Sequence, residues 1–396
     1  MRSFRIGTAF GIPIKLDLTF LLVLPLFAYL IGSQITATAE LLNDAIAAGI
    51  EVDAITTGLT PWALGLVAAI GLFVGILLHE LGHSFVAMRY GYPIDSITLW
   101  IFGGIAALSE MPEDWRQEFN IAIAGPIVSV LVGLVCYGLF VGVLLVEPFE
   151  SVPIVTFGTL FVLGYLAVLN IVLAVFNMIP AFPMDGGRIL RAFLARNRPY
   201  ARATEMAAEV GKFFAVLLGL FGLFSFNIIM IGVAFFVYIA ASTEAKQVMM
   251  KAALEGVTVA DVMTPAERLH TVPPEMTISE LLQKMFTQRH TGYPVMSNGR
   301  PVGIVTLDDA REVQPVERDA YTVDDIMTRD LRTISPDADA MEAITTLQQD
   351  DIGRLLVVDG FGTVVGLVSR TDLMTALDVI RSSGSESLGD QTEPIR

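Results

Sequence analysis

The chain has 396 residues, 54% of them apolar and 17% charged, with a formal net charge of −16 at pH 7. This length is enough for about two or three domains. The acidic balance argues against nucleic-acid binding, which needs a basic surface. The single cysteine, Cys136, lies in an apolar run, so the chain has neither a disulfide framework nor a cysteine-ligated metal cluster.

Apolar and charged residues are unevenly distributed along the chain. Residues 1–243 contain long runs without charge and carry 16 acidic against 11 basic residues, whereas residues 244–396 carry 25 against 14. We therefore expect a membrane-embedded part followed by a soluble, acidic part. The acidic excess also hints at a halophilic source.

Six segments of the first part are long and apolar enough to cross a membrane, which takes about 20 mostly apolar residues. They are approximately 16–35, 62–88, 118–146, 154–180, 203–224 and 226–243. Lys and Arg precede the first segment, follow the second, fourth and sixth, and are absent from the connections 36–61 and 147–153. Because basic residues favour the cytoplasmic side, we expect a multi-pass protein of the cell membrane with both termini in the cytoplasm.

Two stretches of this membrane part are not expected to be helical. Residues 92–104 are rich in β-branched and aromatic side chains and end in two glycines, which predicts a short membrane-associated β-hairpin. Residues 177–187 contain two prolines and two glycines, which should end the fourth helix. Non-helical backbone at membrane depth survives only when it is buried in protein or lines a wet cavity. Both stretches therefore indicate an internal polar site.

The sequence His79-Glu80-Leu81-Gly82-His83 indicates a metal site in the second span. Residues four positions apart lie on one face of a helix, so both imidazoles can bind a single Zn²⁺ ion. Glu80 is offset around the helix and is free to take a proton from an attacking water. The alternative, satisfied polar residues at a helix end, is disfavoured because such groups are costly inside an apolar run without a function.

A catalytic zinc site needs a third protein ligand, for which Asp185 is the best candidate. Its carboxylate follows the broken end of the fourth span and is beside two glycines that let the backbone approach closely. The alternative is that Asp185 caps the helix that continues through Arg188. Asn177 could donate a hydrogen bond to the substrate or the oxyanion, or only form an interhelical hydrogen bond that stabilises the bundle.

The predicted hairpin has a possible role in substrate binding. A helical substrate hides its peptide carbonyls in internal hydrogen bonds, so cleavage requires local unwinding. The unwound segment could pair with the edge of the hairpin's first strand, and glycines would allow close approach. The expected substrate-binding residues are Ile97, Leu99, Ile101, Gly103 and Gly104. The alternative is an ordinary structural hairpin.

The second part of the chain contains an internal repeat with a period of about 63 residues. Asp261-Val262-Met263-Thr264 recurs as Asp325-Ile326-Met327-Thr328, and Gly303-Ile304-Val305-Thr306 recurs as Gly366-Leu367-Val368-Ser369. This period is too long for a solenoid and indicates two tandem copies of a small α/β module.

Each copy is predicted as helix, strand, tight turn, strand, helix. The first helices are near 278–288 and 338–349, and the turns are at Asn298-Gly299 and Asp359-Gly360. The predicted domains are 1–245 for the membrane part, 246–320 and 321–381 for the two copies, and 382–396 for a disordered tail.

The first part resembles the site-2 protease family of intramembrane metalloproteases. The matching stretches are residues 79–83, Gly103-Gly104, Ala124-Gly125-Pro126 and Asn177-x-x-Pro180-x-x-Pro183-x-Asp185-Gly186. The resemblance covers about residues 5–245. It implies a zinc endopeptidase that cuts transmembrane segments of membrane-protein substrates within the lipid bilayer, with Asp185 as third ligand and Asn177 in the active site.

The tandem copies resemble a pair of CBS modules. The resemblance implies that ATP, ADP or AMP binds between the copies and regulates the protease, and that the pair can form a homodimer. Each copy has a hydroxyl residue and an acidic residue three positions later, which could bind ribose and phosphate: Thr306 with Asp309, and Ser369 with Asp372. Alternatively each pair is only a helix N-cap with an acid in the first turn.

The predicted fold is thus a multi-pass α-helical membrane protein with six transmembrane helices and a short β-hairpin, followed by a soluble α/β tandem CBS module. The main competing hypothesis is a CBS-regulated ion channel or transporter. It is disfavoured because no inverted repeat is evident and an ion path does not require Glu80 between the histidines. An inactive relative is disfavoured by the complete set of ligands and base.

Overall fold

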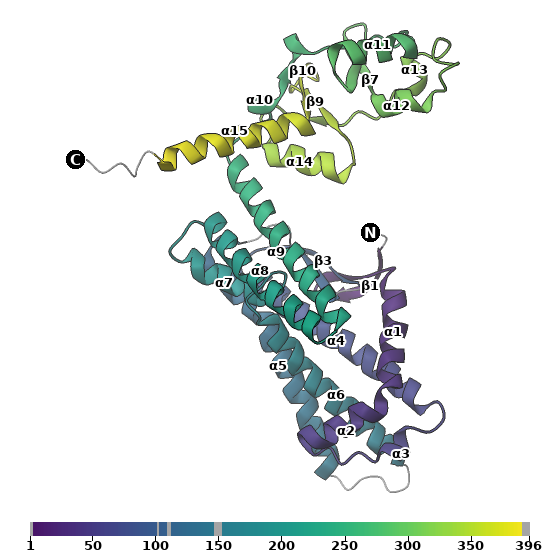
Figure 1. The fold of residues 1–396 in the computed structure, drawn as a ribbon, viewed down its shortest axis with the longest axis vertical. Coiled ribbons are helices and arrows are strands. Elements are labelled where there is room, and N and C mark those ends of the chain that lie inside the picture. The colour runs from purple at the N-terminus through teal and green to yellow at the C-terminus, as the bar shows by residue number, and fades with distance from the viewer. Residues whose placement is uncertain (1–2, 101–102, 109–111, 146–152, 390–396) are drawn as a thin grey trace, which may run out of the picture. The chain divides into compact units, whose positions relative to one another are not determined.

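The computed structural model describes residues 3–100, 103–108, 112–145 and 153–389 (Figure 1). The chain divides into two compact units, Met1–Val248 and Met249–Arg396. Each unit has hydrophobic clusters of its own. The division lies close to residue 245, where the sequence predicts the end of the membrane domain.

The first unit contains a four-stranded sheet that the sequence predicts only in part. β1 (Ser3–Ala9) and β2 (Ile12–Asp17) form an antiparallel hairpin, and so do β3 (Ile94–Trp100) and β4 (Gly103–Leu108). β2 pairs with β3 in parallel, so the order is β1-β2-β3-β4. The hairpin of β3 and β4 is confirmed, whereas β1 and β2 are not predicted by the sequence.

Five helices of the first unit are each long and apolar enough to span a membrane. They are α4 (Thr60–Arg89), α5 (Trp115–Leu145), α6 (Pro153–Asn177), α8 (Tyr200–Phe224) and α9 (Ile228–Leu254). They correspond to the second to sixth predicted spans. α9 continues beyond the predicted end at residue 243 because no Gly or Pro interrupts residues 244–254.

The first predicted span is a bent pair of helices. α1 (Phe20–Ser33) and α2 (Ile35–Ile46) meet at an angle of 67°. At 1.5 Å per residue α1 alone is about 21 Å long, which is short of a hydrocarbon core of about 30 Å. By length and composition, the described residues therefore provide five helices able to span a membrane, or six if the bent pair counts as one span.

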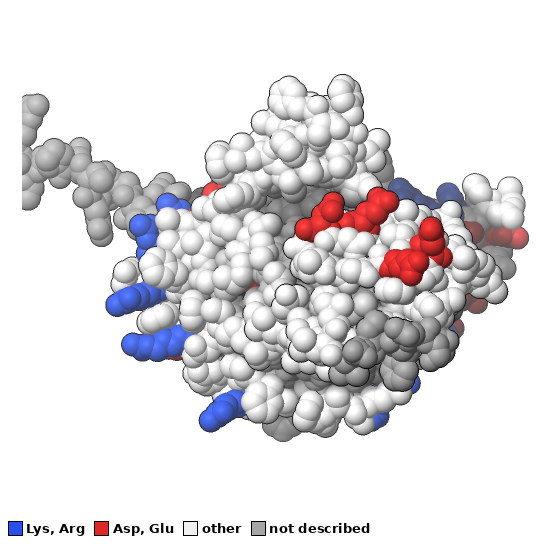
Figure 2. Space-filling model, turned by 90° about the horizontal axis from the view of Figure 1, so that it is seen from below, with Lys and Arg blue, Asp and Glu red and all other residues white. Residues whose placement is uncertain are grey.

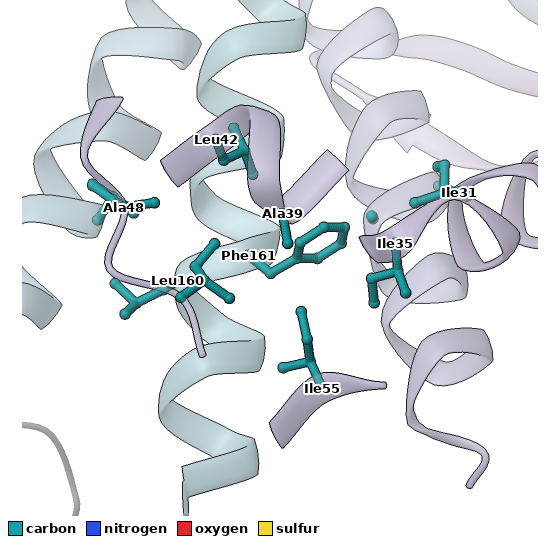
Figure 3. Packing of buried hydrophobic residues seen from close by; sticks show 12 residues of the cluster. Ile31, Ile35, Ala39, Leu42, Ala48, Ile55, Leu160 and Phe161 are labelled. Carbon is teal, nitrogen blue, oxygen red and sulfur yellow. The ribbon is translucent and has the colours of Figure 1, made fainter. Parts of the chain in front are cut away.

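The connection between the first and second predicted spans folds against the helices. α2 and α3 (Val52–Ile55) bury apolar side chains against α6 (Figure 3). The cluster includes Ile35, Ala39, Leu42, Ile55, Leu160 and Phe161. The four acidic residues of this connection are exposed, and Figure 2 shows acidic side chains gathered on the face seen there. The connection is thus a packed part of the bundle with a solvated acidic surface.

The second unit contains the predicted order of elements in both copies. The first copy has α11 (Ile278–Gln288), β6 (Gly292–Ser297), β7 (Arg300–Thr306) and α12 (Leu307–Glu312). The second has α14 (Ala340–Gln349), β9 (Arg354–Val358), β10 (Val364–Ser369) and α15 (Arg370–Gly389).

The two copies are interlocked. β5 (Thr264–Pro265), from the start of the first copy, pairs with β10 of the second. In return, Thr328 of the second copy forms a bridge with Ile304 of β7. The predicted boundary at residue 320 therefore separates sequence repeats, while the two copies share one compact unit.

Two local features of this unit differ from the sequence expectation. The turn at Asn298-Gly299 has two residues with positive φ, as expected, but the loop after Asp359 is longer than two residues. There the Asp359 carboxylate accepts hydrogen bonds from the backbone N–H groups of Phe361 and Thr363, and Gly362 has a φ of 79°. α15 continues to Gly389, past the predicted start of a disordered tail, because no proline stops it.

Short capped helices begin each copy. At α13 (Val323–Ile326) the backbone N–H and the hydroxyl of Thr322 both donate to Oδ2 of Asp325 at 2.8 Å. α10 (Val259–Val262) is capped in the same way by Thr258 and Asp261. The hydrogen bonds from Thr322 lower the pKa of the Asp325 carboxyl.

We expect Asp325→Asn to weaken the cap of α13 in a pH-dependent manner. The lowered pKa means that the stabilisation by Asp325 is present above the unfolded-state pKa of about 3.9 and is lost as the pH falls through the folded-state pKa. Hydrogen-exchange protection of residues 323–327 should therefore differ between wild type and variant near neutral pH and converge under acidic conditions. Asp337→Asn, outside the capping boxes, is the control, and an equal effect there would contradict the interpretation.

Candidate metal centre

The two histidines of the predicted motif lie buried on α4. His79 is 4% exposed and His83 is 6% exposed. Their spacing places both rings on one side of the helix, with the ring planes at 81° and the two Nε2 atoms 3.1 Å apart. Both Nε2 atoms therefore face the same small volume.

Asp185 completes this cluster from a distant part of the sequence. It is the first residue of α7 (Asp185–Ala195) and is 7% exposed. Its Oδ2 lies 3.1 Å from Nε2 of His79 and 3.2 Å from Nε2 of His83. The N-cap of α7 is Met184, with no side-chain cap. The alternative role for Asp185 as helix cap is therefore wrong.

The three ligand atoms fit a zinc ion. Tetrahedral coordination with bonds of about 2.0–2.1 Å places ligand atoms roughly 3.3–3.4 Å apart. The three atoms of His79, His83 and Asp185 are separated by 3.1–3.2 Å. Two imidazole nitrogens and one carboxylate oxygen are also the donor set of many catalytic zinc sites, which leave a position open for water. The residues present thus suit Zn²⁺.

Each imidazole is oriented through its other nitrogen. Nδ1 of His83 donates to the backbone carbonyl of Ile121 at 2.7 Å, and Nδ1 of His79 lies 2.9 Å from the hydroxyl of Ser129. Both partners belong to α5. Such contacts fix the tautomer that leaves Nε2 free for a metal. The sequence analysis missed Ser129 and Ile121 because no local pattern indicates which residues of α5 face α4.

Two glycines make room for the centre. A Cβ atom on Gly125 would lie 2.2 Å from Nε2 of His83 and 2.7 Å from Nε2 of His79. A Cβ atom on Gly104 would lie 2.4 Å from Cγ of Glu80. Any larger residue at either position would therefore intrude on the ligands or on the expected base.

The described geometry leaves Glu80 outside the ligand cluster. The cluster consists of His79, His83 and Asp185, whose ligand atoms lie within 4.8 Å of one another. Glu80 is half-buried on α4 with the backbone of β4 against it. This arrangement suits a base beside the metal rather than a ligand.

The other expected active-site residue, Asn177, ends α6. Its side-chain amide donates to the carbonyl of Leu173 in the same helix at 3.0 Å. This hydrogen bond lies within α6, so it is not the interhelical contact considered as an alternative. A catalytic role of Asn177 stays a prediction.

The expected pairing of substrate with the first strand of the hairpin is wrong. β3 lies inside the sheet, with Ile97 and Leu99 paired to β2 on one side and to β4 on the other. Both residues are also buried, at 0% and 4% exposure. Ile101 lies outside the described residues. The edge of the sheet next to Glu80 is instead β4, which begins with Gly103 and Gly104.

The four residues expected to bind nucleotide form capping boxes. The N–H and hydroxyl of Thr306 donate to Oδ2 of Asp309, and those of Ser369 donate to Oδ2 of Asp372, at 2.7–2.9 Å. The same arrangement occurs at Thr258 and Thr322. α11 is capped by the same pattern through Thr277 and Glu280. A hydroxyl residue followed by an acid therefore has a structural use at five helices of the described residues, and nucleotide binding at two of them stays a prediction.

Both parts of this chain are similar in sequence to known proteins. Residues 67–154 and 145–218 match peptidase family M50, and residues 259–315 and 323–379 match the CBS domain. A zinc metalloprotease of Methanocaldococcus jannaschii is 36% identical over 378 residues, which are 96% of this chain and 97% of that protein. Stage IV sporulation protein FB of Bacillus subtilis is 27% identical over 192 residues, 45% of this chain and 62% of that protein.

A solved structure of a site-2 protease from Methanocaldococcus jannaschii is 38% identical, covers 62% of this chain and 95% of that chain, and has a TM-score of 0.40. The family assignment rests on the archaeal zinc metalloprotease, whose similarity extends over nearly the whole chain. The chain therefore belongs to peptidase family M50 and is a site-2-protease-like metalloendopeptidase with a C-terminal pair of CBS domains.

Proposed function

We propose that this protein is a Zn²⁺-dependent intramembrane endopeptidase that cleaves transmembrane segments of membrane-protein substrates. The observation that carries the proposal is the convergence of Nε2 of His79, Nε2 of His83 and Oδ2 of Asp185 among helices apolar enough to span a membrane. Such a polar cluster is costly in an apolar bundle unless it serves a function. A Zn²⁺ ion bound there supplies a Lewis acid that polarises the peptide carbonyl and lowers the pKa of water.

Glu80 carries out the proton transfers in this proposal. Its carboxylate accepts a proton from the attacking water and then donates it to the nitrogen of the leaving peptide strand. The close approach of Gly104 to Cγ of Glu80 limits the conformations that the Glu80 side chain can adopt. Asn177 would exchange its hydrogen bond with the Leu173 carbonyl for one with the developing oxyanion.

The edge of β4 is the place where an unwound substrate would bind. β4 pairs with β3 on one side, and no further strand follows it in the sheet order of the described residues. An extended substrate segment can satisfy its backbone groups there by strand addition. Gly103 and Gly104 lie at the start of this strand, and Gly104 is next to Glu80, so a paired segment would pass close to the base.

Membrane sidedness follows from the distribution of charge. Basic residues flank the ends of the spans that lead to the two termini, and the connection 36–61 is acidic. By the positive-inside rule both termini lie in the cytoplasm. The CBS pair would then be exposed to cytoplasmic metabolites. We propose that it binds an adenine nucleotide and forms a homodimer.

The CBS proposal is supported by the family match of both copies and by the position of Asp309 and Asp372 at the first turns of α12 and α15. These carboxylates follow β7 and β10 in equivalent places of the two copies. Each carboxylate also caps its helix, so ligand binding has to be measured separately from helix capping.

We expect Glu80→Gln to abolish cleavage while retaining zinc. Removing a general base typically lowers a rate by about 10²–10⁴-fold, whereas the three ligands are unchanged. The measurements are zinc content of the purified protein and cleavage of a model transmembrane peptide in proteoliposomes. Glu205→Gln, at an exposed ion pair with Arg202, is the control. Wild-type cleavage by the Glu80 variant would contradict the mechanism.

The two close glycines should give different defects. Gly125→Ala places a Cβ at the metal position and should lower zinc content. Gly104→Ala displaces Glu80 and should lower the cleavage rate at normal zinc content. Gly138→Ala, also on α5 but with no atom within 4 Å of the added Cβ, is the matched control. The prediction fails if Gly125→Ala binds zinc as the wild type does.

Calorimetry of the whole chain with ATP, ADP and AMP tests the CBS proposal. We expect one of them to bind, and Asp309→Ala or Asp372→Ala to weaken binding by at least about tenfold, as for a lost hydrogen bond to a charged group. Asp325→Ala, which removes a capping carboxylate that is not among the residues expected to bind nucleotide, is the control. Absence of binding, or equal weakening by Asp325→Ala, would refute a ligand role for these residues.

A further inference from the structure

Arg191 is a buried arginine in the middle of α7. Its side chain is 1% exposed, and it is the largest of the fully buried side chains in the described part of the chain. A guanidinium is costly to remove from water unless its charge and hydrogen bonds are compensated. The contacts that compensate it connect α7 to several other elements.

The guanidinium binds two carboxylates from different helices. Its Nε donates to Oε1 of Glu118 on α5 at 2.7 Å, and its Nη2 lies 2.6 Å from the same oxygen. Its Nη1 donates to Oε1 of Glu244 on α9 at 2.6 Å. Arginine suits this arrangement because its planar fork presents donors in fixed directions.

Aromatic rings hold the guanidinium from two further segments. Its central carbon lies 5.0 Å from the ring centre of Phe182, in the segment before α7, and 4.9 Å from that of Tyr200, at the start of α8. Both distances are within the range of cation–π contacts. Arg191 therefore contacts α5, α8, α9 and the segment before α7.

These contacts bear on the metal centre through Asp185. Asp185 begins α7, and added Cβ atoms on Gly186 and Gly187 would lie 2.3 Å and 2.7 Å from the backbone of the preceding segment. The position of α7 therefore sets the position of the Asp185 carboxylate. On α5, Glu118 precedes Ile121, whose carbonyl accepts the hydrogen bond from His83. The contact of Arg191 with Glu118 thus joins the helix of one ligand to the helix that orients another.

Stability alone is a weak explanation for this cluster. A buried ion pair is often no more stabilising than apolar residues of the same volume. Here one guanidinium faces two carboxylates, and Oε2 of Glu118 is buried without a hydrogen-bond partner among the described residues. The geometry that the cluster imposes therefore explains it better than the stability that it adds.

The third helix in the cluster leads to the CBS pair. Glu244 lies on α9, which continues past Val248, the end of the first unit, to Leu254. Leu254 is fully buried in a hydrophobic cluster of the second unit, and Met250 packs against that cluster. A shift or rotation of α9 would therefore move the Glu244 carboxylate that Arg191 contacts.

We propose that Arg191 is a positioning residue for the metal centre, which holds α7 between Glu118 and Glu244 so that Asp185 meets the two imidazoles. Because Glu244 lies on α9, the position of α9 also affects the metal centre through Arg191. α9 is the helix that joins the first unit to the CBS pair. This inference rests on the proposed metal-dependent function.

The test uses whole-chain variants loaded with Co²⁺ in place of Zn²⁺, because the visible absorption of Co²⁺ reports its ligands without activity. Arg191→Lys keeps the charge but loses the fork, and Glu244→Ala removes only the contact with α9. Both should remain folded, change the Co²⁺ spectrum and weaken metal binding by about 10–100-fold, as when a residue that supports a ligand is lost. Glu209→Ala, which removes an exposed ion pair with Lys212 on α8, should match the wild type.

Wild-type affinity and spectrum in both variants would overturn the positioning role. If Arg191→Lys does not fold, the double variant Arg191→Met with Glu118→Met removes the opposed buried charges together. We expect this protein to fold and still bind metal weakly, and wild-type binding would overturn the proposal. If the wild-type chain itself binds neither Co²⁺ nor Zn²⁺, the metal-dependent function fails, and the positioning role with it.

Discussion

The structure depends on bringing two imidazoles and a carboxylate to one point inside an apolar helical unit. His79, His83 and Asp185 are each less than a tenth exposed, and their ligand atoms lie 3.1–3.2 Å apart. Polar groups are expensive in such surroundings unless they are paired or bind metal. The neighbouring elements can be understood as the means of meeting this constraint.

Those elements act through close approach and through hydrogen bonds. α5 supplies the Ile121 carbonyl and the Ser129 hydroxyl to the imidazoles, and at Gly125 it comes close enough to leave no room for a side chain. The break after α6 turns the chain so that α7 starts at Asp185. β4 brings Gly104 against Glu80. The same non-helical stretches that interrupt the spans thus surround the candidate metal centre.

The features that sequence analysis could predict are those with a local signal. The spacing of His79 and His83 on a helix is such a signal, and so are the glycine and proline breaks that mark the hairpin and the end of α6. Asp185 has a weaker local signal, because an acid before a helix can also be a cap, and it is the family motif that predicts it as a ligand. The predicted membrane spans agree with the helices of the structure because a long apolar run is itself the physical requirement for crossing a membrane.

The features that the sequence could not show depend on long-range packing. β3 is an interior strand because β2, from the start of the chain, pairs with it, and no periodicity near β3 indicates that partner. α7 contains two arginines, Arg188 and Arg191. Only the burial of Arg191 against Glu118 and Glu244 distinguishes it from Arg188. The hydroxyl and acid pairs of the CBS unit failed as a specific signal because capping uses the same residues at the same spacing.

The most direct test of the central claim is X-ray absorption at the zinc edge of the purified, full-length protein. The account predicts one zinc per chain with two imidazole nitrogens and at least one oxygen at about 2.0–2.2 Å, and loss of one imidazole in either histidine variant. A folded protein with no stoichiometric zinc, or a zinc shell without imidazole, would contradict it.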